Sequence, residues 1–411
     1  MSERFVATDI AIIGGGLAGT SLLAHLGAVG WTGDVTIIDD GEFPLEMRMW
    51  SWWSQGDMLL DSAATVHYMV ARCASDTWVK TGSLTPFAYR TITGTALNEA
   101  AAALTMGAVH VTRVCGKAVA VSREADSTVC VVDTPHGLVE VRAPRMYDSV
   151  GIGCAIEAGP SVPRLDFVGW RVHSTAAAFT PGVMTFMDFR TDQSHGLAFV
   201  YVLPITVHDA LIDHTVYVTG WAAPPIDHER RIREYLSAVC GVRHVTLVQV
   251  EEGPISLALP ERPAREATQI GAAAGAVKLS TGYAFARIQR HCAVIADAVV
   301  AGEPDPPLAT SGRLTRVLDR VLLGVIRAEP QAGQMMLEAL VRRLHWRLLL
   351  AFLDEDVCVR DLLRLCSRVP PTVFVRAIVK CLRRKLTPRD SGRRRTELIP
   401  AGERASSDVE S

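Results

Sequence analysis

Three glycines near the N-terminus are spaced for binding a pyrophosphate. Gly14, Gly16 and Gly19 lie in DIAIIGGGLAGTSLLAHL, an apolar strand followed by a turn and a helix. The first glycine of such a unit allows the tight turn, the second lets backbone N–H groups approach the phosphates, and the third lets helix and strand pack closely. We expect these glycines, with Leu17 and Ala18 between them, to hold the pyrophosphate of a dinucleotide.

An acidic pair ends the next apolar strand, VTIIDD, at Asp39 and Asp40. A carboxylate about twenty residues after the last glycine accepts hydrogen bonds from a ribose hydroxyl pair. Such an acid suits the unphosphorylated ribose of FAD or NAD. Because the unit opens the chain, as in many flavoproteins, it favours FAD. Glycine turns alone are weak signals, but here the strand, the helix and the acid agree.

A second strand, glycine turn and helix are predicted in ATQIGAAAGAVKLSTGYAFARIQRHCAVIADAVVAG. A plain connection between a strand and a helix is the alternative interpretation. The residues of this stretch that we expect at the cofactor are Gly271, Gly275, Thr281, Gly282 and Tyr283.

The composition indicates a globular protein with a large core. The chain has 411 residues, 49% of them hydrophobic, and a net charge of −2, which argues against disorder and against nucleic-acid binding by charge. Its nine cysteines form no CxxC and no cluster at metal-ligand spacing, so we expect reduced thiols and no metal. With no evident signal peptide or spanning helix, we expect a cytoplasmic protein, with peripheral contact at the inner membrane face left open.

The order of the remaining patterns predicts the elements that position these residues. The tryptophan cluster at 48–57 is expected in a loop, and alternating residues over 127–144 predict a hairpin that turns at His136 and Gly137. Residues 165–218 are rich in β-branched and aromatic side chains at strand period, which predicts an antiparallel sheet. Helices are expected at 95–104, at 227–238 and across 313–384.

Several separated segments together resemble the soluble, FAD-containing lycopene cyclases of carotenoid biosynthesis. Besides the first glycine unit and the tryptophan cluster, they are LDFVGWRV, VMTFMDFRTDQ, AFVYVLPITVHDALIDHT, VEEGPISL and IGAAAGAVKLSTGYAFARI, in family order. The resemblance implies an α/β fold of the glutathione-reductase type. On this resemblance we expect a discontinuous FAD-binding Rossmann-like domain (1–160 and 250–310), an antiparallel-sheet substrate domain (161–249) and a C-terminal helical cap (311–386). The charged and polar composition of the end predicts a disordered tail (387–411).

The resemblance also implies an unusual reaction. The family requires reduced FAD although the reaction has no net redox change, and NAD(P)H is the candidate reductant. The enzyme protonates the end of a hydrophobic polyisoprenoid, closes a six-membered ring through a carbocation and removes a proton. Protonating an alkene needs a carboxylic acid kept partly neutral by burial in a pocket that excludes water. In the second glycine turn, backbone donors would stabilise the anionic reduced flavin.

Asp213, in ALIDHT, matches the position at which the family carries a catalytic glutamate. This chain departs from the family twice, with Asp213 for that glutamate and His214 for the acid that follows it. A shorter acid leaves the reaction type intact and puts the substrate in doubt. The alternative is that Asp213 caps a turn between strands.

Three further residues are candidates for the acid network. His214 could tune Asp213, although neighbours in a strand point to opposite faces and a surface histidine is as plausible. Glu252 stands in the family motif VEEGPISL, where a solvated acid is the alternative. Asp188 lies on an apolar strand, either as a member of the network or as half of an ion pair with Arg190.

Aromatic faces would stabilise a carbocation as they attract ammonium groups. Core packing is the alternative for each ring. The candidates for the substrate pocket are Trp50, Trp52, Trp170, Phe199 and Tyr201, with Trp53 and Tyr283 as further candidates.

Lycopene is the default substrate, and the altered motif makes a shorter prenyl chain or a meroterpenoid a serious competitor. An FAD monooxygenase or prenyl reductase would share both glycine turns, and a non-enzymatic flavin or lipid carrier is a third class. The basic helices RRLHWRLLLAFL and VFVRAIVKCLRRKL could lie at an anionic membrane surface, or they could cover a core with a solvated basic face.

Overall fold

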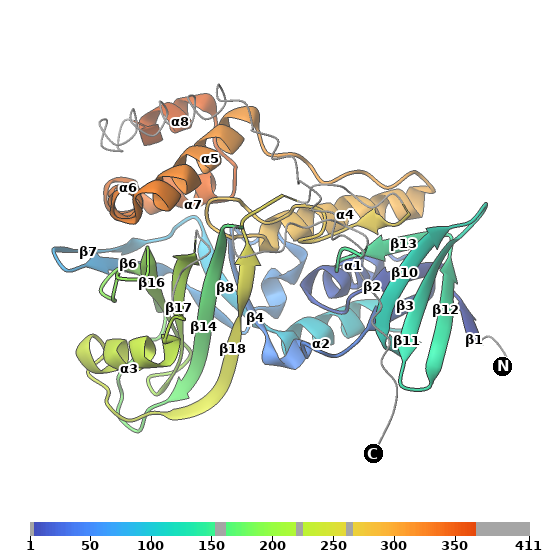
Figure 1. Cartoon of the computed structure of the whole chain (residues 1–411), viewed down its shortest axis with the longest axis horizontal. Coiled ribbons are helices and arrows are strands. Elements are labelled where there is room, and N and C mark those ends of the chain that lie inside the picture. Colours follow the sequence, from blue (N-terminus) through green and yellow to red (C-terminus); the bar gives the residue numbers. More distant parts are fainter. Residues whose placement is uncertain (1–3, 153–161, 219–224, 260–265, 367–411) are drawn as a thin grey trace, which may run out of the picture.

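The computed structural model describes residues 4–152, 162–218, 225–259 and 266–366. The predicted disordered tail at 387–411 lies outside the described residues, as does the predicted helical region after residue 366 with its basic segment VFVRAIVKCLRRKL. Within the described part, the chain forms four sheets and a C-terminal group of helices (Figure 1).

A parallel sheet of five strands in the order β19-β13-β2-β3-β9 contains the first glycine unit. The fully buried strand β2 (Ile10–Ile13) leads through the glycine turn into α1 (Leu17–Ala28) and then into β3 (Gly33–Asp39). β2 and β3 pair in parallel, with Ile10 opposite Val35, so the predicted βαβ unit is confirmed. The remaining elements of this part are α2 (Gly94–Thr105), β9 (Val109–Cys115), β13 (Arg145–Asp148), β19 (Thr268–Gln269) and α4 (Phe285–Ala301).

The predicted hairpin is confirmed in a second sheet, of order β1-β12-β11-β10. Its strands β11 and β12 pair from Thr128 opposite Ala143 to Thr134 opposite Gly137. The strands of this sheet are β1 (Arg4–Ala7), β10 (Lys117–Arg123), β11 (Thr128–Thr134) and β12 (Gly137–Ala143).

The tryptophan cluster forms a strand, so the expected loop is wrong. β4 (Met49–Ser54) pairs with β8 (Ala88–Thr93), which in turn pairs with β5 (Val66–Tyr68). Trp52 and Trp53 pack into two different hydrophobic clusters, so β4 is covered on both faces. A strand buried on both faces lacks the polar and apolar alternation that marks a half-exposed strand. Short 3₁₀ helices flank β4 at Leu45–Met47 and Leu59–Ala63.

The largest sheet has seven strands in the order β18-β14-β17-β16-β15-β6-β7. Neighbouring strands are antiparallel except for β15 and β6, which are parallel. Its strands are β6 (Val70–Ser75), β7 (Trp78–Ser83), β14 (Arg164–His173), β15 (Val183–Asp188), β16 (Ala198–Pro204), β17 (Asp209–Val218) and β18 (Thr246–Ser256). β6 and β7 therefore join this sheet from inside the range that we expected for the FAD-binding domain, and the domain ranges stay a prediction.

Helices cover the two faces of the seven-stranded sheet (Figure 1). The predicted helix at 227–238 is confirmed as α3 (His228–Ala238), whose first turn is capped by the Asp227 carboxylate. α3 packs on one face, around Trp170, Ile212 and Ile232. The opposite face packs against the C-terminal helices.

The C-terminal helices form a cap, as predicted, up to the last described residue. They are α5 (Arg313–Ala328), α6 (Pro330–Arg343), α7 (Trp346–Leu353) and α8 (Val359–Cys366). No helix in the described ranges is both long and apolar enough to span a bilayer. Arg342, Arg343 and Arg347 are exposed on the cap, and contact of this region with a membrane surface stays a prediction.

Candidate functional site

A cavity of ≈ 660 Å³ lies over the face of the seven-stranded sheet that is turned away from α3. Strands β14, β16, β17 and β18 supply one wall, β4 and β8 supply Trp50, Ser51 and Tyr89, and the loop before α4 supplies Thr281 to Tyr283. Its lining residues are Leu17, Phe43, Arg48, Met49, Trp50, Ser51, Tyr89, Leu165, Phe167, Phe199, Tyr201, Leu203, Leu211, Asp213, Thr215, Glu251, Glu252, Gly253, Pro254, Ile255, Thr281, Gly282 and Tyr283.

Two carboxyl groups stand in one row across this wall. Asp213 of β17 lies opposite Tyr201 of β16 on one side and opposite Gly169 of β14 on the other. Gly169 in turn lies opposite Glu251 of β18. Since directly opposite residues in a sheet share a face, Asp213 and Glu251 point into the same cavity with only a glycine between them. We call Asp213, Gly169 and Glu251 the carboxyl row.

The Asp213 carboxyl group is held in an apolar and aromatic environment. Among the described residues its hydrogen-bond partner is Thr215, whose hydroxyl donates to Asp213 Oδ1 over 2.7 Å. No cation among the described residues forms an ion pair with it. Burial raises the pKa of Asp213 to about 6, against the opposing effect of the Thr215 hydrogen bond. The group is thus partly protonated near neutral pH, as an acid catalyst needs to be.

Glu251 is the second carboxyl group that points into the cavity, and it was not among the residues predicted from the sequence. The Met49 N–H donates to Glu251 Oε2 over 3.2 Å. Burial, and next the negative charge of Asp213, raise the pKa of Glu251 to about 7, while Arg48 acts in the opposite direction. The acid pair in VEEGPISL was the available signal. Only the pairing of β18 with β14 decides which of the two acids faces the cavity.

Glu252 and His214 lie on the other face of the sheet. The Glu252 side chain is exposed; this residue borders the cavity, and its backbone oxygen accepts a hydrogen bond from Arg48. His214 is buried, and its Nδ1 lies 2.9 Å from Nδ1 of His228 in α3. Burial, with the neighbouring His228, lowers the pKa of His214 to about 3. The expectation that His214 tunes Asp213 is wrong, because the alternation of side chains along β17 turns the imidazole away.

Asp188 forms an ion pair away from the cavity. Its carboxylate accepts hydrogen bonds from Arg190 Nε at 2.9 Å and Nη2 at 2.6 Å, and from the Tyr235 hydroxyl of α3 at 2.7 Å. Of the two predicted alternatives, the structural pair with Arg190 is confirmed. The other alternative, that Asp188 belongs to the acid network, is wrong, because this fully buried side chain faces α3.

The predicted aromatic residues divide between the cavity and the two cores. Trp50, Phe199 and Tyr201 line the cavity, as expected. Trp52 does not, because it stacks on Phe285 at 4.1 Å between ring centroids, and Trp170 is wrongly predicted because it packs on the α3 face. Tyr89 of β8 also lines the cavity and was not predicted from the sequence.

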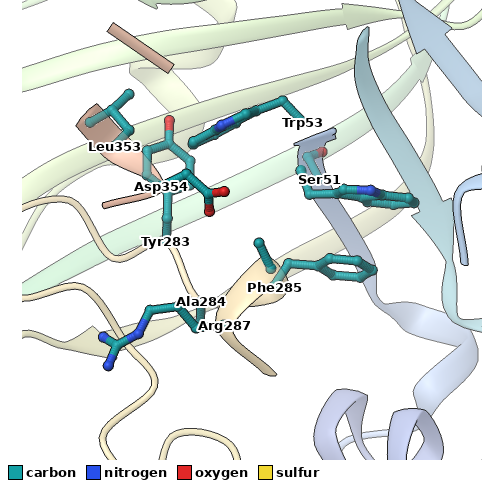
Figure 2. A pocket seen from close by; sticks show the side chains of 10 residues that line it. Ser51, Trp53, Tyr283, Ala284, Phe285, Arg287, Leu353 and Asp354 are labelled. Atoms are coloured by element: carbon teal, nitrogen blue, oxygen red, sulfur yellow. The ribbon is translucent and has the colours of Figure 1, made fainter. Parts of the chain in front are cut away.

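Tyr283 completes the aromatic lining. Its hydroxyl lies 2.8 Å from that of Tyr201, and its ring meets Trp53 edge-on at 4.8 Å. Figure 2 shows Tyr283 and Trp53 at a second, much smaller cavity of ≈ 20 Å³, with Leu353 and Asp354 of the cap beside them. Tyr283 lines both cavities, so the cap is packed directly behind the aromatic wall.

The first glycine turn has the geometry that a pyrophosphate needs. Gly14 has φ +94°, and a Cβ on Gly19 would lie 2.0 Å from the Gly14 oxygen, so neither position tolerates a side chain. A Cβ on Gly16 would meet no described atom within 4 Å. No side chain of the described residues caps the start of α1 at Gly16. The first backbone N–H groups of the helix, those of Leu17 and Ala18, are therefore available to bind an anion.

A further cavity of ≈ 340 Å³ lies beside the end of β3. Asp39 and Asp40 line it, together with Gly15, Asn98 and Arg113 among others. Asp39 already accepts hydrogen bonds from the Gly15 N–H at 2.6 Å and the Gly41 N–H at 2.9 Å. A carboxylate has acceptor sites for more than two donors, so Asp39 retains acceptor sites for the ribose hydroxyls. Phe43 borders this cavity and the large one.

The second glycine turn packs against the first. Gly271 has φ +64°, and a Cβ there would lie 2.6 Å from Cβ of Ala18. Gly275 and Gly282 also have positive φ, of +81° and +79°. The buried Thr281 hydroxyl has no hydrogen-bond partner within the described ranges and belongs to a residue that lines the large cavity. An open helix start, a ribose-side acid and an orphaned hydroxyl at the cavity fit a dinucleotide such as FAD.

Solved structures of flavoproteins share this fold. A geranylgeranyl bacteriochlorophyll reductase-like protein from Thermoplasma acidophilum is 14% identical, with a TM-score of 0.61 over 91% of this chain and 99% of that one. A flavoprotein/dehydrogenase from Cytophaga hutchinsonii is 13% identical, with a TM-score of 0.59 over 92% and 100%. An anhydrotetracycline hydroxylase from Streptomyces rimosus is 17% identical, with a TM-score of 0.54 over 86% and 77%. At these identities the likeness shows the fold, that of FAD-binding flavoproteins, and nothing beyond it.

The family follows from the sequence as a whole. No curated protein matches the chain. The model of the family described as "Lycopene cyclase protein" matches residues 9–379, which include both glycine turns, the carboxyl row and most of the cap. The chain therefore belongs to the lycopene cyclase family.

Proposed function

We propose that this protein is an FAD-dependent enzyme that cyclises one end of a linear isoprenoid by protonation, without net redox change, with lycopene as the default substrate. The observation that carries the proposal is Asp213, a carboxyl group with a pKa raised to about 6 in an aromatic cavity that adjoins the nucleotide-binding turns. Membership of the lycopene cyclase family supports the same reaction.

The nucleotide would be held by the two glycine turns. Gly14, Gly16 and Gly19 with the start of α1 would receive the pyrophosphate, and Asp39 the ribose, while Thr281 and Gly282 would meet the flavin ring. Bound in its reduced form, with NAD(P)H as the expected reductant, FAD would supply negative charge beside the reacting end of the substrate.

The chemistry required of the protein is proton transfer in a dry cavity. The Asp213 carboxyl group donates its proton to the terminal double bond, whose electron pair forms the new C–H bond. The resulting carbocation is attacked by a second double bond, which closes the ring. Loss of a neighbouring proton then forms a new double bond. Tyr89, Tyr201 and Tyr283 present aromatic rings that stabilise positive charge, and the surrounding side chains exclude water that would capture it.

The cavity leaves the chain length of the substrate open. A volume of ≈ 660 Å³ is that of a site for one drug-sized ligand, so we propose that it takes one end of an isoprenoid. Asp213 is one methylene shorter than the glutamate of the family pattern, so the substrate end would have to approach β17 more closely. A shorter prenyl chain or a meroterpenoid is therefore the alternative to lycopene.

The test is anaerobic incubation of the FAD-loaded, reduced protein with lycopene and with shorter linear isoprenoids, followed by mass and ring analysis. A cyclase returns a product with the mass of the substrate and one ring more. A gain of two hydrogens would indicate a prenyl reductase, and a gain of oxygen in air a monooxygenase; either would replace the proposal. Conversion of no substrate, with FAD retained, would favour a carrier.

A further inference from the structure

The carboxyl row contains a second group that can exchange protons with a substrate. Asp213 and Glu251 are separated by two strand spacings, about 10 Å between Cα positions, and Gly169 leaves the space between them free. A Cβ built on Gly169 would lie 3.9 Å from Cβ of Glu251 and 3.3 Å from Cδ1 of Leu211. Any larger side chain there would stand between the two carboxyl groups. The glycine therefore keeps both of them open to one ligand.

The other polar groups that face the cavity are poor proton acceptors. The pKa values of Tyr89, Tyr201 and Tyr283 are raised by burial, so these hydroxyls stay protonated. Arg48 is a cation near the rim. Because His214 and the Glu252 side chain lie on the other face, Glu251 is the carboxylate beside Asp213 in the described wall.

The charges of the pair give it one acid and one base. No described cation forms an ion pair with either carboxyl group, and Arg48 only partly offsets the effect of burial on Glu251. Two carboxylates in one low-dielectric cavity resist being ionised together, so the pair tends to hold a single proton near neutral pH. Because the pKa of Glu251, about 7, lies above that of Asp213, about 6, this proton rests mainly on Glu251, and the reactive form is the minor one in which it has passed to Asp213 and Glu251 is ionised. An isomerisation that begins with protonation and ends with deprotonation needs one group in each state.

We propose that Glu251 is the second catalytic carboxyl group of this site, which accepts the proton that the cyclised cation loses. This inference rests on the proposed function. Asp213 gives its proton to the terminal alkene, and the ring closes. The C–H bond beside the cation then breaks, its electron pair forms the new double bond, and the proton passes to Glu251. Return of that proton to Asp213 restores the starting state, so no proton is consumed.

The central variant is Glu251→Gln, which keeps an oxygen to accept the Met49 N–H and removes the base. We expect kcat on the isoprenoid that the wild type cyclises to fall about 100-fold, with KM changed less than twofold. The cation would then lose its proton elsewhere or capture water, so a second product, an isomeric alkene or an alcohol, should appear. Glu251→Asp, which restores a carboxyl group, should recover part of the rate and the original product.

The control is Glu229→Gln, the same change at an exposed carboxylate of α3, which pairs with Arg233 on the opposite face of the sheet. We expect it to keep the rate and product of the wild type. If Glu251→Gln also keeps both, the proposed role of Glu251 is overturned.

A second readout does not need turnover. Infrared titration of protonated carboxyl groups should show a band that Glu251→Gln removes and that moves to lower pH in Asp213→Asn, because Asp213 no longer repels the charge of Glu251. An unmoved band would contradict the coupling of the pair. If the wild type itself cyclises nothing, the proposed function fails; if the wild type cyclises and these variants behave as the control, this inference alone fails.

Discussion

Acidic side chains on the two faces of the seven-stranded sheet differ in their partners. On the α3 face, Asp188 is fully buried and satisfied by Arg190 and Tyr235. On the cavity face, Asp213 has a threonine hydroxyl and no ion pair with a described cation. The same residue type therefore serves stability on one face and, in our proposal, chemistry on the other.

The difference teaches how this sheet separates structure from reactivity. A charge without a counter-ion costs stability, and proteins retain that cost where a shifted pKa is useful. Because side chains alternate along a strand, neighbouring residues such as Asp213 and His214 serve different faces. Matched changes on each face of the sheet test this separation.

The largest expected effect is that of Asp213→Asn on turnover. Removing the proton donor should lower kcat by about 10²- to 10⁴-fold, while the amide still accepts the Thr215 hydrogen bond and FAD stays bound. Steady-state rates and the flavin absorbance of the purified variant check both parts. Retention of more than a tenth of the rate would mean that another group protonates the substrate.

The reciprocal change, Asp188→Asn, should act on stability. It leaves the half-buried Arg190 without its charge partner, which we expect to lower the free energy of unfolding by about 3 kcal/mol. Once folded, the variant should keep its rate per bound FAD within about threefold. Urea unfolding and turnover measured on the same preparation test this. A stable variant with lost activity would place Asp188 in the catalytic network after all.

The free energy of unfolding should depend on pH through Asp213. The pKa of Asp213 is about 6 in the folded protein against 3.8 in a free side chain, so the folded state binds this proton more tightly. The protonated Asp213 carboxyl group contributes to the free energy of unfolding fully below pH 3.8. This contribution is lost as the pH rises to 6, and the loss is at most about 3 kcal/mol.

Asp213→Asn should therefore match the wild type near pH 4 and exceed it by about 2 kcal/mol at pH 8, when both are compared at equal FAD loading. Denaturant unfolding across this range is the measurement. A difference that does not grow with pH would show that Asp213 is ionised at no cost to the folded state.

The smallest expected effect is that of His214→Gln. The imidazole lies under α3 and its pKa, lowered to about 3, keeps it neutral. We expect the rate, the product and the pH optimum of turnover to change by less than twofold. Loss of activity with normal stability would break the distinction between the faces, because it would connect His214 to the cavity.

The sequence predicted those parts of the fold that depend on local patterns. The first βαβ unit, α3 and the hairpin of β11 and β12 have caps, turns and periodicities that stand within one short segment. The tryptophan strand β4 was missed because it is buried on both faces by elements distant in sequence.

The carboxyl row could be predicted only in part. Asp213 was found through the family pattern, but Glu251 was confused with Glu252, because the facing side is set by long-range pairing with β14, which has a register shift between Arg171 and Val172. The role of Asp188 depended likewise on an irregularity, since the register with β16 shifts after Thr185. Bulges reverse the alternation, and local patterns do not show them.

The central claim, that a carboxyl group of the protein protonates the substrate, is tested most directly by turnover in D₂O. Exchangeable protons of Asp213 and Glu251 are replaced by deuterium before the reaction begins. We predict that the reduced, anaerobic holoenzyme returns a cyclic product with one deuterium for each ring formed, and that Asp213→Asn forms this product at least about 100-fold more slowly. A cyclic product without deuterium, or a labelled product made equally well by Asp213→Asn, would contradict the account.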